Sequence, residues 1–272
     1  MKVILYGTRG SVAVANNESK KYGGNTTCLY VETKTGKPII IDSGTGIRTL
    51  GVDLVKNSKR DLNMIFTHYH WDHIQGFPFF APMFFKNVNV AIYGSKKETS
   101  AKTALTYQMT LPYFPATLND LLAKVTFKEM KTKLKIGEVM IETIPTNHPN
   151  YTIGLKFSEG KNSFAFLTDN ELKAENCKTP YEKFVAFLKG VKFFIHDAQY
   201  TDEIYPTKLG WGHSTFSQVM QLAKDAGVKR VVFTHHDHSS TDAFIDKQVK
   251  EMSTLHPGFN IQAAADGKSF NL

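Results

Sequence analysis

The hydrophobic positions of this chain fall into short runs that alternate with polar and glycine-rich turns, as β-strands do. These runs predict strands near residues 2–7, 27–33, 38–42, 63–67, 88–93, 124–129, 138–144, 152–157, 163–168, 192–196, 229–234 and 259–264. A helical period of apolar positions predicts helices at about 96–109, 180–189, 215–226 and 241–253. Strands that come first and alternate with helices later indicate a mixed α/β sandwich.

The highest density of potential metal-binding side chains in the chain follows the apolar run Met64–Phe66. Four potential metal ligands stand there within six consecutive positions: His68, His70, Asp72 and His73. A strand that ends at a sheet edge and turns tightly can direct the first two histidines at one cation and the other pair at a second. Imidazole and carboxylate at this density suit zinc, with manganese and iron as alternatives. A histidine-rich surface turn that arose by chance is the competing interpretation, and four ligands in this pattern argue against it.

The motif resembles the H-x-H-x-D-H pattern of the metallo-β-lactamase superfamily of hydrolases. The resemblance implies an αββα sandwich of two mixed sheets flanked by helices, with two divalent metal ions at one edge. It also implies three later ligands, and the chain supplies His148 after one predicted strand and Asp169 and His235 at the ends of two others. The implied assignment is His68, His70 and His148 to the first ion, Asp72, His73 and His235 to the second, and Asp169 to both.

Two divalent ions in such a site can hold a shared hydroxide, because each ion lowers the pKa of bound water towards about 7. The hydroxide is the nucleophile, and the ions neutralise oxygens on the group that is cleaved. This chemistry suits phosphodiesters, lactones, thioesters and amides. The metal site by itself therefore does not select the substrate.

Two further motifs, at 195–200 and 211–215, resemble paired motifs of ribonuclease Z and related phosphodiesterases. In that branch an acidic residue orients a histidine that meets the phosphate. The resemblance implies that Asp197, in place of the usual glutamate, orients His213, which can bind a phosphoryl oxygen or protonate a leaving alkoxide. The alternative is that the second motif only starts a helix, with Ser214 as its cap. The predicted catalytic residues are Asp72, Asp197 and His213.

Other features allow two interpretations. Arg9 and Asn25 stand in loops that line the metal site in the phosphodiesterase branch, but ordinary hairpin turns need the same neighbouring glycines. We expect Asp42, in an Asp-x-Gly turn after a strand, to support the site rather than to bind an ion. Aromatic residues crowd an insertion at about 76–115 and could stack a nucleobase. Packing or a dimer interface is the more common role of such clusters.

Length and composition agree with one domain over residues 1–272 that includes this insertion. The hydrophobic fraction of 42% is ample for a core, and two cysteines without a motif argue against a disulfide framework. We see no leader peptide and no stretch of about 20 apolar residues, so we expect a cytoplasmic protein without a membrane partner. The net charge of +8 favours anionic partners, although the lysines form no long basic run.

The sequence therefore predicts a dinuclear metal hydrolase, and more narrowly a phosphodiesterase. The Gly-Pro-rich arm with which ribonuclease Z grips transfer RNA has no counterpart here, so we expect a small phosphodiester such as a 3′,5′-cyclic nucleotide as substrate and a homodimer as assembly. An RNA-processing endonuclease of the ribonuclease Z type is the nearest alternative. A lactonase or thioesterase would use the same ions without needing His213, and a nucleotide sensor would bind without turnover.

Overall fold

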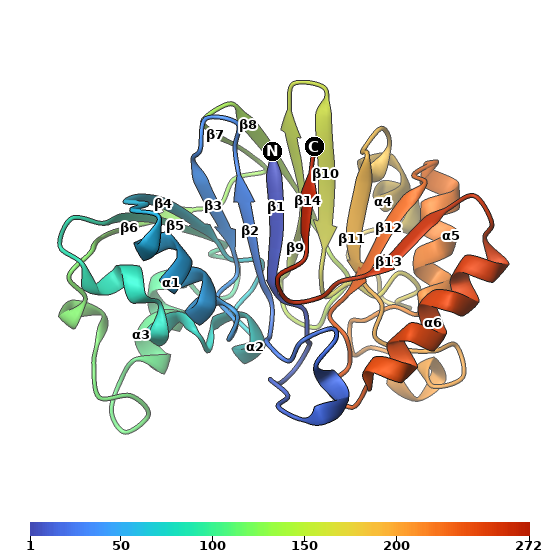
Figure 1. Ribbon diagram of the computed structural model, residues 1–272, viewed down its shortest axis with the longest axis horizontal. Coiled ribbons are helices and arrows are strands. Elements are labelled where there is room, and N and C mark those ends of the chain that lie inside the picture. The colour runs from blue at the N-terminus through green and yellow to red at the C-terminus, as the bar shows by residue number, and fades with distance from the viewer.

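The computed structural model describes residues 1–272 and contains two seven-stranded β-sheets (Figure 1). The first sheet is formed by β1 (Lys2–Gly7), β2 (Cys28–Glu32), β3 (Pro38–Ile41), β4 (Asp61–Ile65), β5 (Asn89–Gly94), β6 (Lys124–Glu129) and β14 (Ser269–Asn271). The second is formed by β7 (Lys133–Ile136), β8 (Val139–Pro145), β9 (Ile153–Glu159), β10 (Asn162–Leu167), β11 (Phe193–Asp197), β12 (Arg230–Thr234) and β13 (Asn260–Ala263).

Both sheets are mixed in the same way. The first has the order β14-β1-β2-β3-β4-β5-β6, and its strands from β3 to β6 run parallel. The second has the order β13-β12-β11-β10-β9-β8-β7, and its strands from β10 to β13 run parallel. The remaining pairs are antiparallel. Parallel strands deliver their carboxyl ends to one edge of a sheet, which is where ligand sites form in such folds.

Six α-helices complete the sandwich: α1 (Ile47–Lys56), α2 (Trp71–Ile74), α3 (Ala101–Gln108), α4 (Tyr181–Leu188), α5 (Phe216–Ala226) and α6 (Asp242–Leu255). Figure 1 shows α1 and α3 beside the first sheet and α5 and α6 beside the second. Short 3-10 turns lie at Asn17–Ser19, Phe77–Phe79, Ala81–Phe84, Leu118–Asp120 and Tyr205–Lys208. None of the helices combines the length and the apolar character that crossing a bilayer requires.

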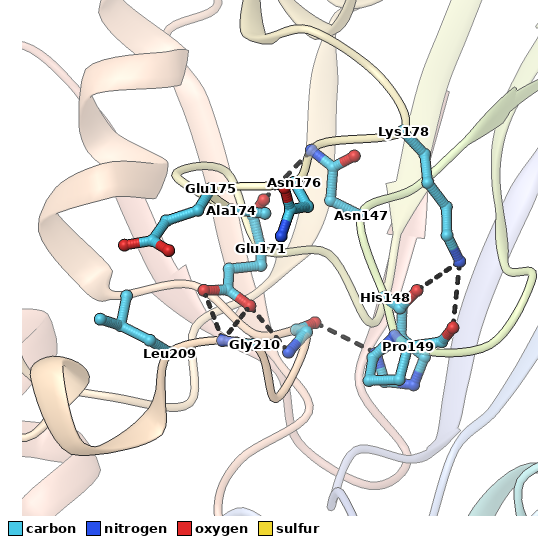
Figure 2. Close-up of a pocket in the computed structure, with 11 residues that line it drawn as sticks. Asn147, His148, Pro149, Glu171, Ala174, Glu175, Asn176, Lys178, Leu209 and Gly210 are labelled. Carbon is cyan, nitrogen blue, oxygen red and sulfur yellow. Dashed lines mark hydrogen bonds between the residues drawn. The ribbon is translucent and has the colours of Figure 1, made fainter.

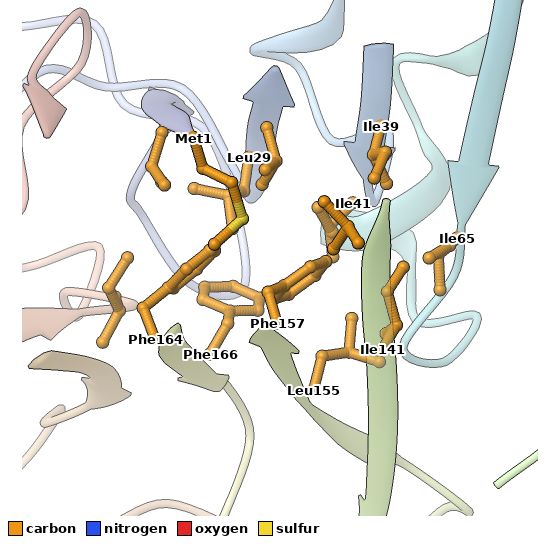
Figure 3. Packing of buried hydrophobic residues seen from close by; sticks show 14 of the residues in the cluster. Met1, Leu29, Ile39, Ile41, Ile65, Ile141, Leu155, Phe157, Phe164 and Phe166 are labelled. Atoms are coloured by element: carbon orange, nitrogen blue, oxygen red, sulfur yellow. The ribbon is translucent and has the colours of Figure 1, made fainter. Parts of the chain in front are cut away.

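Buried side chains form three layers that follow from the alternation along each strand. Ile39 and Ile41 of β3 face the space between the sheets, whereas Ile40 faces α1 and α3. Between the sheets the rings of Phe157 and Phe164 stack with centroids 4.7 Å apart, and Figure 3 shows them opposite isoleucines of the first sheet. A third cluster lies between the second sheet and helices α4, α5 and α6. These layers are the αββα sandwich that the sequence predicted, and the fold prediction is confirmed.

Some elements differ from the prediction. The sequence predicted no helix at α1 and no strand at β7 or β14. The helix expected from residue 96 begins only at Ala101, because the Ser100 hydroxyl accepts a hydrogen bond from the Thr103 amide at 3.1 Å and caps it there. The strand expected at 63–67 is β4, which ends at Ile65. The segment that leaves the sheet towards the histidine motif is therefore longer than predicted.

The aromatic-rich segment 76–115 divides between core and surface. Phe77 and Phe80 are buried under α1 and contribute to the cluster outside the first sheet. Phe79 and Tyr113 are 58% and 80% exposed. The segment also supplies β5, which lies between β4 and β6. Packing therefore accounts for part of the aromatic cluster, and the exposed members are free to meet a ligand or a second copy.

Candidate dinuclear metal centre

The predicted ligands follow the ends of strands from both sheets. His68 comes three residues after β4, His148 three after β8, Asp169 two after β10 and His235 directly after β12. Within each of two groups the ligand atoms lie within 4.8 Å of one another; the groups are His68, His70, His148 and Asp169, and Asp72, His73 and His235. The structure thus brings together the residues that were assigned to each ion. That ions occupy both groups is a prediction.

Three residues at this edge adopt a backbone conformation that is rare outside glycine. The φ angle is 60° at Asp42, 53° at Asp169 and 56° at His235. Such left-handed positions cost about 1–3 kcal/mol each, and they persist where the surrounding structure holds them. Because they follow β3, β10 and β12 at one edge, the strain is concentrated where the site side chains must converge.

Hydrogen bonds fix which nitrogen of each histidine in the first group is free. The Nδ1 of His68 lies 3.1 Å from the Thr67 hydroxyl, and the Nε2 of His70 donates to Asn150 Oδ1 at 2.7 Å. The Nδ1 of His148 donates to the Gly212 carbonyl at 3.3 Å. The other nitrogen of each ring therefore carries a lone pair, and those of His70 and His148 face each other at 3.1 Å. Two lone pairs so close repel each other unless a cation lies beside both.

Burial strengthens this arrangement by disfavouring protonation. Burial lowers the pKa of His148 to about 4, although Asp169 opposes the shift. Burial, followed by the neighbouring His73, lowers the pKa of His68 well below its usual value. Neutral imidazoles at neutral pH are the form in which histidine binds a metal ion.

The second group is ordered by Asp42, which lies outside it. One carboxylate oxygen of Asp42 accepts from His73 Nδ1 at 2.9 Å and from the Thr67 hydroxyl at 2.8 Å. This leaves the Nε2 of His73 free, 3.3 Å from Asp72 Oδ2. The Nε2 of His235 lies 3.1 Å from the same oxygen of Asp72. Asp42 thus supports the site by orienting a histidine, in the role that the sequence assigned to it.

Asp169 stands between the two groups, and its two oxygens face different ones. Oδ1 lies 3.3 Å from His73 Nε2 and 3.4 Å from His235 Nε2. Oδ2 lies 3.7 Å from His68 Nε2 and 3.8 Å from His148 Nε2. Burial opposes ionisation of Asp169, but these imidazoles outweigh it and hold its pKa well below the usual range. One ionised carboxylate can therefore serve both groups.

The donor set fits a pair of divalent cations. The Nε2 atoms of His68 and His73 are buried and have no hydrogen-bond partner, which is costly for a polar atom unless an ion binds it. The carboxylates of Asp42, Asp72 and Asp169 are each at most 6% exposed, and buried negative charge at this density needs positive charge nearby. Nitrogen and oxygen donors of this kind are the ones that zinc, manganese and iron accept.

His213 adjoins both groups. Its Nδ1 donates to Asp197 Oδ2 at 2.8 Å, and Asp197 is fully buried at the end of β11. The His213 ring lies 5.0 Å from the ring of His235 and 5.4 Å from that of His148. A ligand atom of His213 also lies within 4.8 Å of Asp169 and His235. The aspartate, although one methylene shorter than glutamate, therefore reaches the histidine that it was predicted to orient.

Known proteins are similar to this chain in sequence and in fold. The sequence profile of the "Beta-lactamase superfamily domain" matches residues 38–236. The chain belongs to the β-lactamase superfamily. A ribonuclease Z of Clostridium novyi (strain NT) is 27% identical over 258 residues, which are 74% of this chain and 79% of that protein. The prediction of a metal-dependent hydrolase of the metallo-β-lactamase superfamily, in the branch that includes ribonuclease Z, is confirmed.

Solved structures support the same fold. The metallo-β-lactamase fold protein YhfI from Bacillus subtilis has a TM-score of 0.72 at 18% identity, covering 99% of this chain and 98% of that one. A structure described as a new diphosphatase from the PhnP family has the same TM-score at 18% identity and covers 100% of this chain and 97% of that one. At this level of identity the likeness concerns the fold alone.

Four other residues of this superfamily member have structural roles. Arg9 is fully buried, and its guanidinium donates to the carbonyls of Gly23, Asp237 and Ser240, so it fastens loops and does not face the site. Thr215, not Ser214, caps α5, because its hydroxyl accepts from the Gln218 amide. The Ser214 hydroxyl instead donates to the Asn170 carbonyl at 2.6 Å. Asn25 is tied to Asp266 and Thr45 by its side chain.

The glycines of two loops indicated from the sequence that the backbone comes close to other groups, but not which side chains it meets. A Cβ on Gly10 would lie 2.4 Å from His235 Nδ1. A Cβ on Gly212 would lie 2.1 Å from His148 Nδ1, and Gly212 also has a φ of +87°. Glycine in a loop usually indicates a turn, and only the fold shows that these two leave room for ligands.

Two glycines of one loop provide a matched test of that contact. Gly210 and Gly212 both have positive φ, so alanine at either position adds strain of about 1–2 kcal/mol. Only Gly212→Ala also displaces His148, because a Cβ on Gly210 meets nothing within 4 Å. We expect Gly212→Ala to weaken binding of one ion by about 10- to 100-fold and Gly210→Ala to leave it near the wild-type value. Zinc titration against a chromophoric chelator measures this, and equal affinities in both variants would contradict the contact.

Proposed function

We propose that this protein is a dinuclear metal-dependent phosphodiesterase that hydrolyses a small phosphodiester such as a 3′,5′-cyclic nucleotide. Two zinc ions are the proposed cofactors, with manganese and iron(II) as alternatives. The observation that carries the proposal is the His213–Asp197 pair at the edge of both ligand groups. The predicted ligands suit many hydrolases, whereas this pair is suited to the charge of a phosphoryl group.

When bound, the two ions supply an activated water and neutralise charge on phosphoryl oxygens. The chain supplies the rest. Hydrogen bonds hold four histidine rings so that their free nitrogens face the centre. The partners are Thr67 for His68, Asn150 for His70, Asp42 for His73 and the Gly212 carbonyl for His148. Asp72, which lies beside His73 and His235, is placed to accept a hydrogen bond from the attacking water and so to orient it.

His213 handles the charge and the proton of the substrate. Its Nδ1–H is committed to Asp197, so its Nε2 is the atom available to a ligand. In the protonated form Nε2 can donate to a phosphoryl oxygen or pass its proton to the leaving alkoxide, and the buried carboxylate stabilises the imidazolium. General acid catalysis of this kind contributes typically about 10²–10⁴-fold to a rate.

A ribonuclease Z type of RNA-processing endonuclease is the second candidate. The Clostridium novyi relative bears that name, and the net charge of +8 suits a polyanion. A small substrate is preferred because the chain has no counterpart of the Gly-Pro-rich arm with which ribonuclease Z grips transfer RNA. The exposed Phe79 and Tyr113 are consistent with the expected homodimer, which we propose as the assembly.

One substrate panel with a single metal-loaded preparation tests the proposal. We expect turnover of bis(p-nitrophenyl) phosphate and of 3′,5′-cyclic nucleotides, with kcat/KM at least about 10²-fold above that for lactones and thioesters, because only the diesters use His213. Colorimetric release and chromatography of the nucleotide products measure the rates. Preferential cleavage of precursor RNA would favour the second candidate. A preparation that opens lactones and leaves diesters intact would refute the phosphodiesterase proposal.

A further inference from the structure

Glu171 is a buried carboxylate close to the metal centre that the proposed function does not use. It follows Asp169 by two residues and is 1% exposed. Its oxygens accept hydrogen bonds only from neutral groups: the Gly210 amide at 3.0 Å, the Gly212 amide at 3.0 Å and the Tyr205 hydroxyl at 2.9 Å. A buried charge without a cationic partner is expensive. The role of Glu171 is therefore inferred from the groups that donate hydrogen bonds to its carboxylate.

The amides that it binds belong to the loop 209–213. The other backbone hydrogen bonds of this loop are those of the Trp211 amide to the Lys208 carbonyl and of His148 Nδ1 to the Gly212 carbonyl. Gly210 and Gly212 both have positive φ, at 81° and 87°, and glycine loses more backbone freedom on ordering than other residues. A cavity of about 340 Å³ lies against this loop and is lined by Leu209, Gly210, Gly212 and Glu171. Figure 2 shows the Glu171 carboxylate reaching across to the Gly210 backbone. No side chain lies within contact distance of a Cβ placed on Gly210, whereas His148 and Pro149 lie against Gly212. The Glu171 carboxylate is the side-chain group that binds the amides of both glycines.

This loop is connected to the metal centre at two points. The Gly212 carbonyl accepts from Nδ1 of His148 at 3.3 Å and thereby leaves Nε2 of that ring free for an ion. The next residue is His213, which carries the predicted acid. Beyond it, the Ser214 hydroxyl donates to the Asn170 carbonyl and accepts from the Leu172 amide at 3.0 Å. Glu171 thus binds Gly212, which precedes His213, and its neighbours Asn170 and Leu172 bind Ser214, which follows His213.

We propose that Glu171 is a positioning residue that sets, through one loop, both a ligand of the first ion and the phosphate-binding His213. Glu171 belongs to none of the groups of possible metal ligands. It holds the Gly212 amide, and Gly212 in turn holds His148 and precedes His213. The role at His148 requires only that the predicted ligands bind metal, whereas the role at His213 also rests on the proposed phosphodiesterase function.

Substitution of Glu171 tests this coupling by metal binding and by kinetics. We expect Glu171→Ala to lower the affinity of the first site for zinc by about 10- to 100-fold. It should also lower kcat for bis(p-nitrophenyl) phosphate by a larger factor than it raises KM. Glu171→Gln keeps the volume and one acceptor oxygen, so it should be intermediate in both readouts. If Glu171→Ala does not fold, the zinc affinity and kinetics of Glu171→Gln alone test the positioning role. Chelator competition gives the affinity of each ion without any assay of activity.

Glu159→Gln is the matched control. Glu159 is a second buried glutamate, 3% exposed, that accepts from the chain amino terminus at 3.1 Å at the far end of β9. Its replacement should lower the melting temperature and leave zinc affinity unchanged. The proposal is overturned if the Glu171 variants bind both ions as the wild type does, or if Glu159→Gln weakens binding equally. A wild type that binds two ions but cleaves no diester would refute the proposed function, and the affinity comparison would still decide the role of Glu171 at His148.

Discussion

Replacement of Asp169 by alanine is expected to lower diester hydrolysis by about 10⁴-fold or more, the scale on which loss of an essential member of a catalytic unit acts. Asp169 is the only carboxylate whose two oxygens face both ligand groups, at 3.3 Å and 3.4 Å on one side and 3.7 Å and 3.8 Å on the other. Its removal takes a ligand from each ion at once. His68→Ala removes a ligand from one ion, and we expect it also to abolish measurable turnover.

Metal content distinguishes loss of ions from loss of folding. Purified Asp169→Ala should carry fewer than two ions per chain by mass spectrometry, and added zinc should raise its melting temperature less than that of the wild type, because stabilisation by a ligand depends on its affinity. Asp225→Ala is the control, since Asp225 is an exposed carboxylate near the end of α5 that pairs with Gln221 and Tyr181. An Asp169→Ala protein with two ions and near wild-type turnover would remove the basis for the assignment of a shared carboxylate.

The ligand residues could be predicted from the sequence because the decisive information is local. Each of His148, Asp169 and His235 stands within one to three residues of the end of a strand, and each of these strands is marked in the sequence by an apolar run. The parallel arrangement of β10, β11 and β12 then gathers the strand ends without any further specification. The division of these residues into two sets came from the resemblance to the metallo-β-lactamase superfamily, and the strand ends explain why the fold brings each set together.

The free nitrogen of each ring could not be predicted in this way, because it depends on contacts between distant segments. His70 is oriented by Asn150, 80 positions away, and His148 by the Gly212 carbonyl, 64 positions away. Glu171 stands in a polar stretch of sequence that suggests an exposed loop, and only the fold buries it beneath Gly210 and Gly212. Backbone groups and neutral partners leave no recognisable pattern in a sequence.

Helix α1 shows the same limit for the fold. Ile47, Leu50 and Leu54 have helical spacing, but Gly51 in the middle of the segment argues against a helix. In the structure a Cβ on Gly51 would lie 3.0 Å from the ring of Phe80, so the glycine allows the 3-10 turns of the aromatic segment to pack closely on α1. A tertiary contact thus outweighs a local preference, and its partner lies outside the helix.

Removal of the His213 side chain is the sharpest test of the substrate class. His213→Ala is expected to lower kcat for bis(p-nitrophenyl) phosphate by about 10²–10⁴-fold, the usual contribution of a general acid. Both ions should be retained, because His213 is not among the seven ligands that the resemblance implies. Any turnover of a lactone should be unchanged, since a lactone carries no phosphoryl charge for the imidazole to meet. Parallel assays of one preparation with the two substrates, together with metal analysis, give the comparison.

His238→Ala is the matched control for His213→Ala, because the side chain of His238 is 52% exposed three residues beyond His235 and belongs to neither ligand group. It should hydrolyse the diester as the wild type does. If His213→Ala lost an ion, the third grouping of Asp169, His213 and His235 would indicate that His213 is itself a ligand. If diester and lactone turnover fell together with both ions in place, the imidazole would act on the water or the fold rather than on the phosphate. A selective loss of diester turnover alone supports its proposed contact with a phosphoryl oxygen.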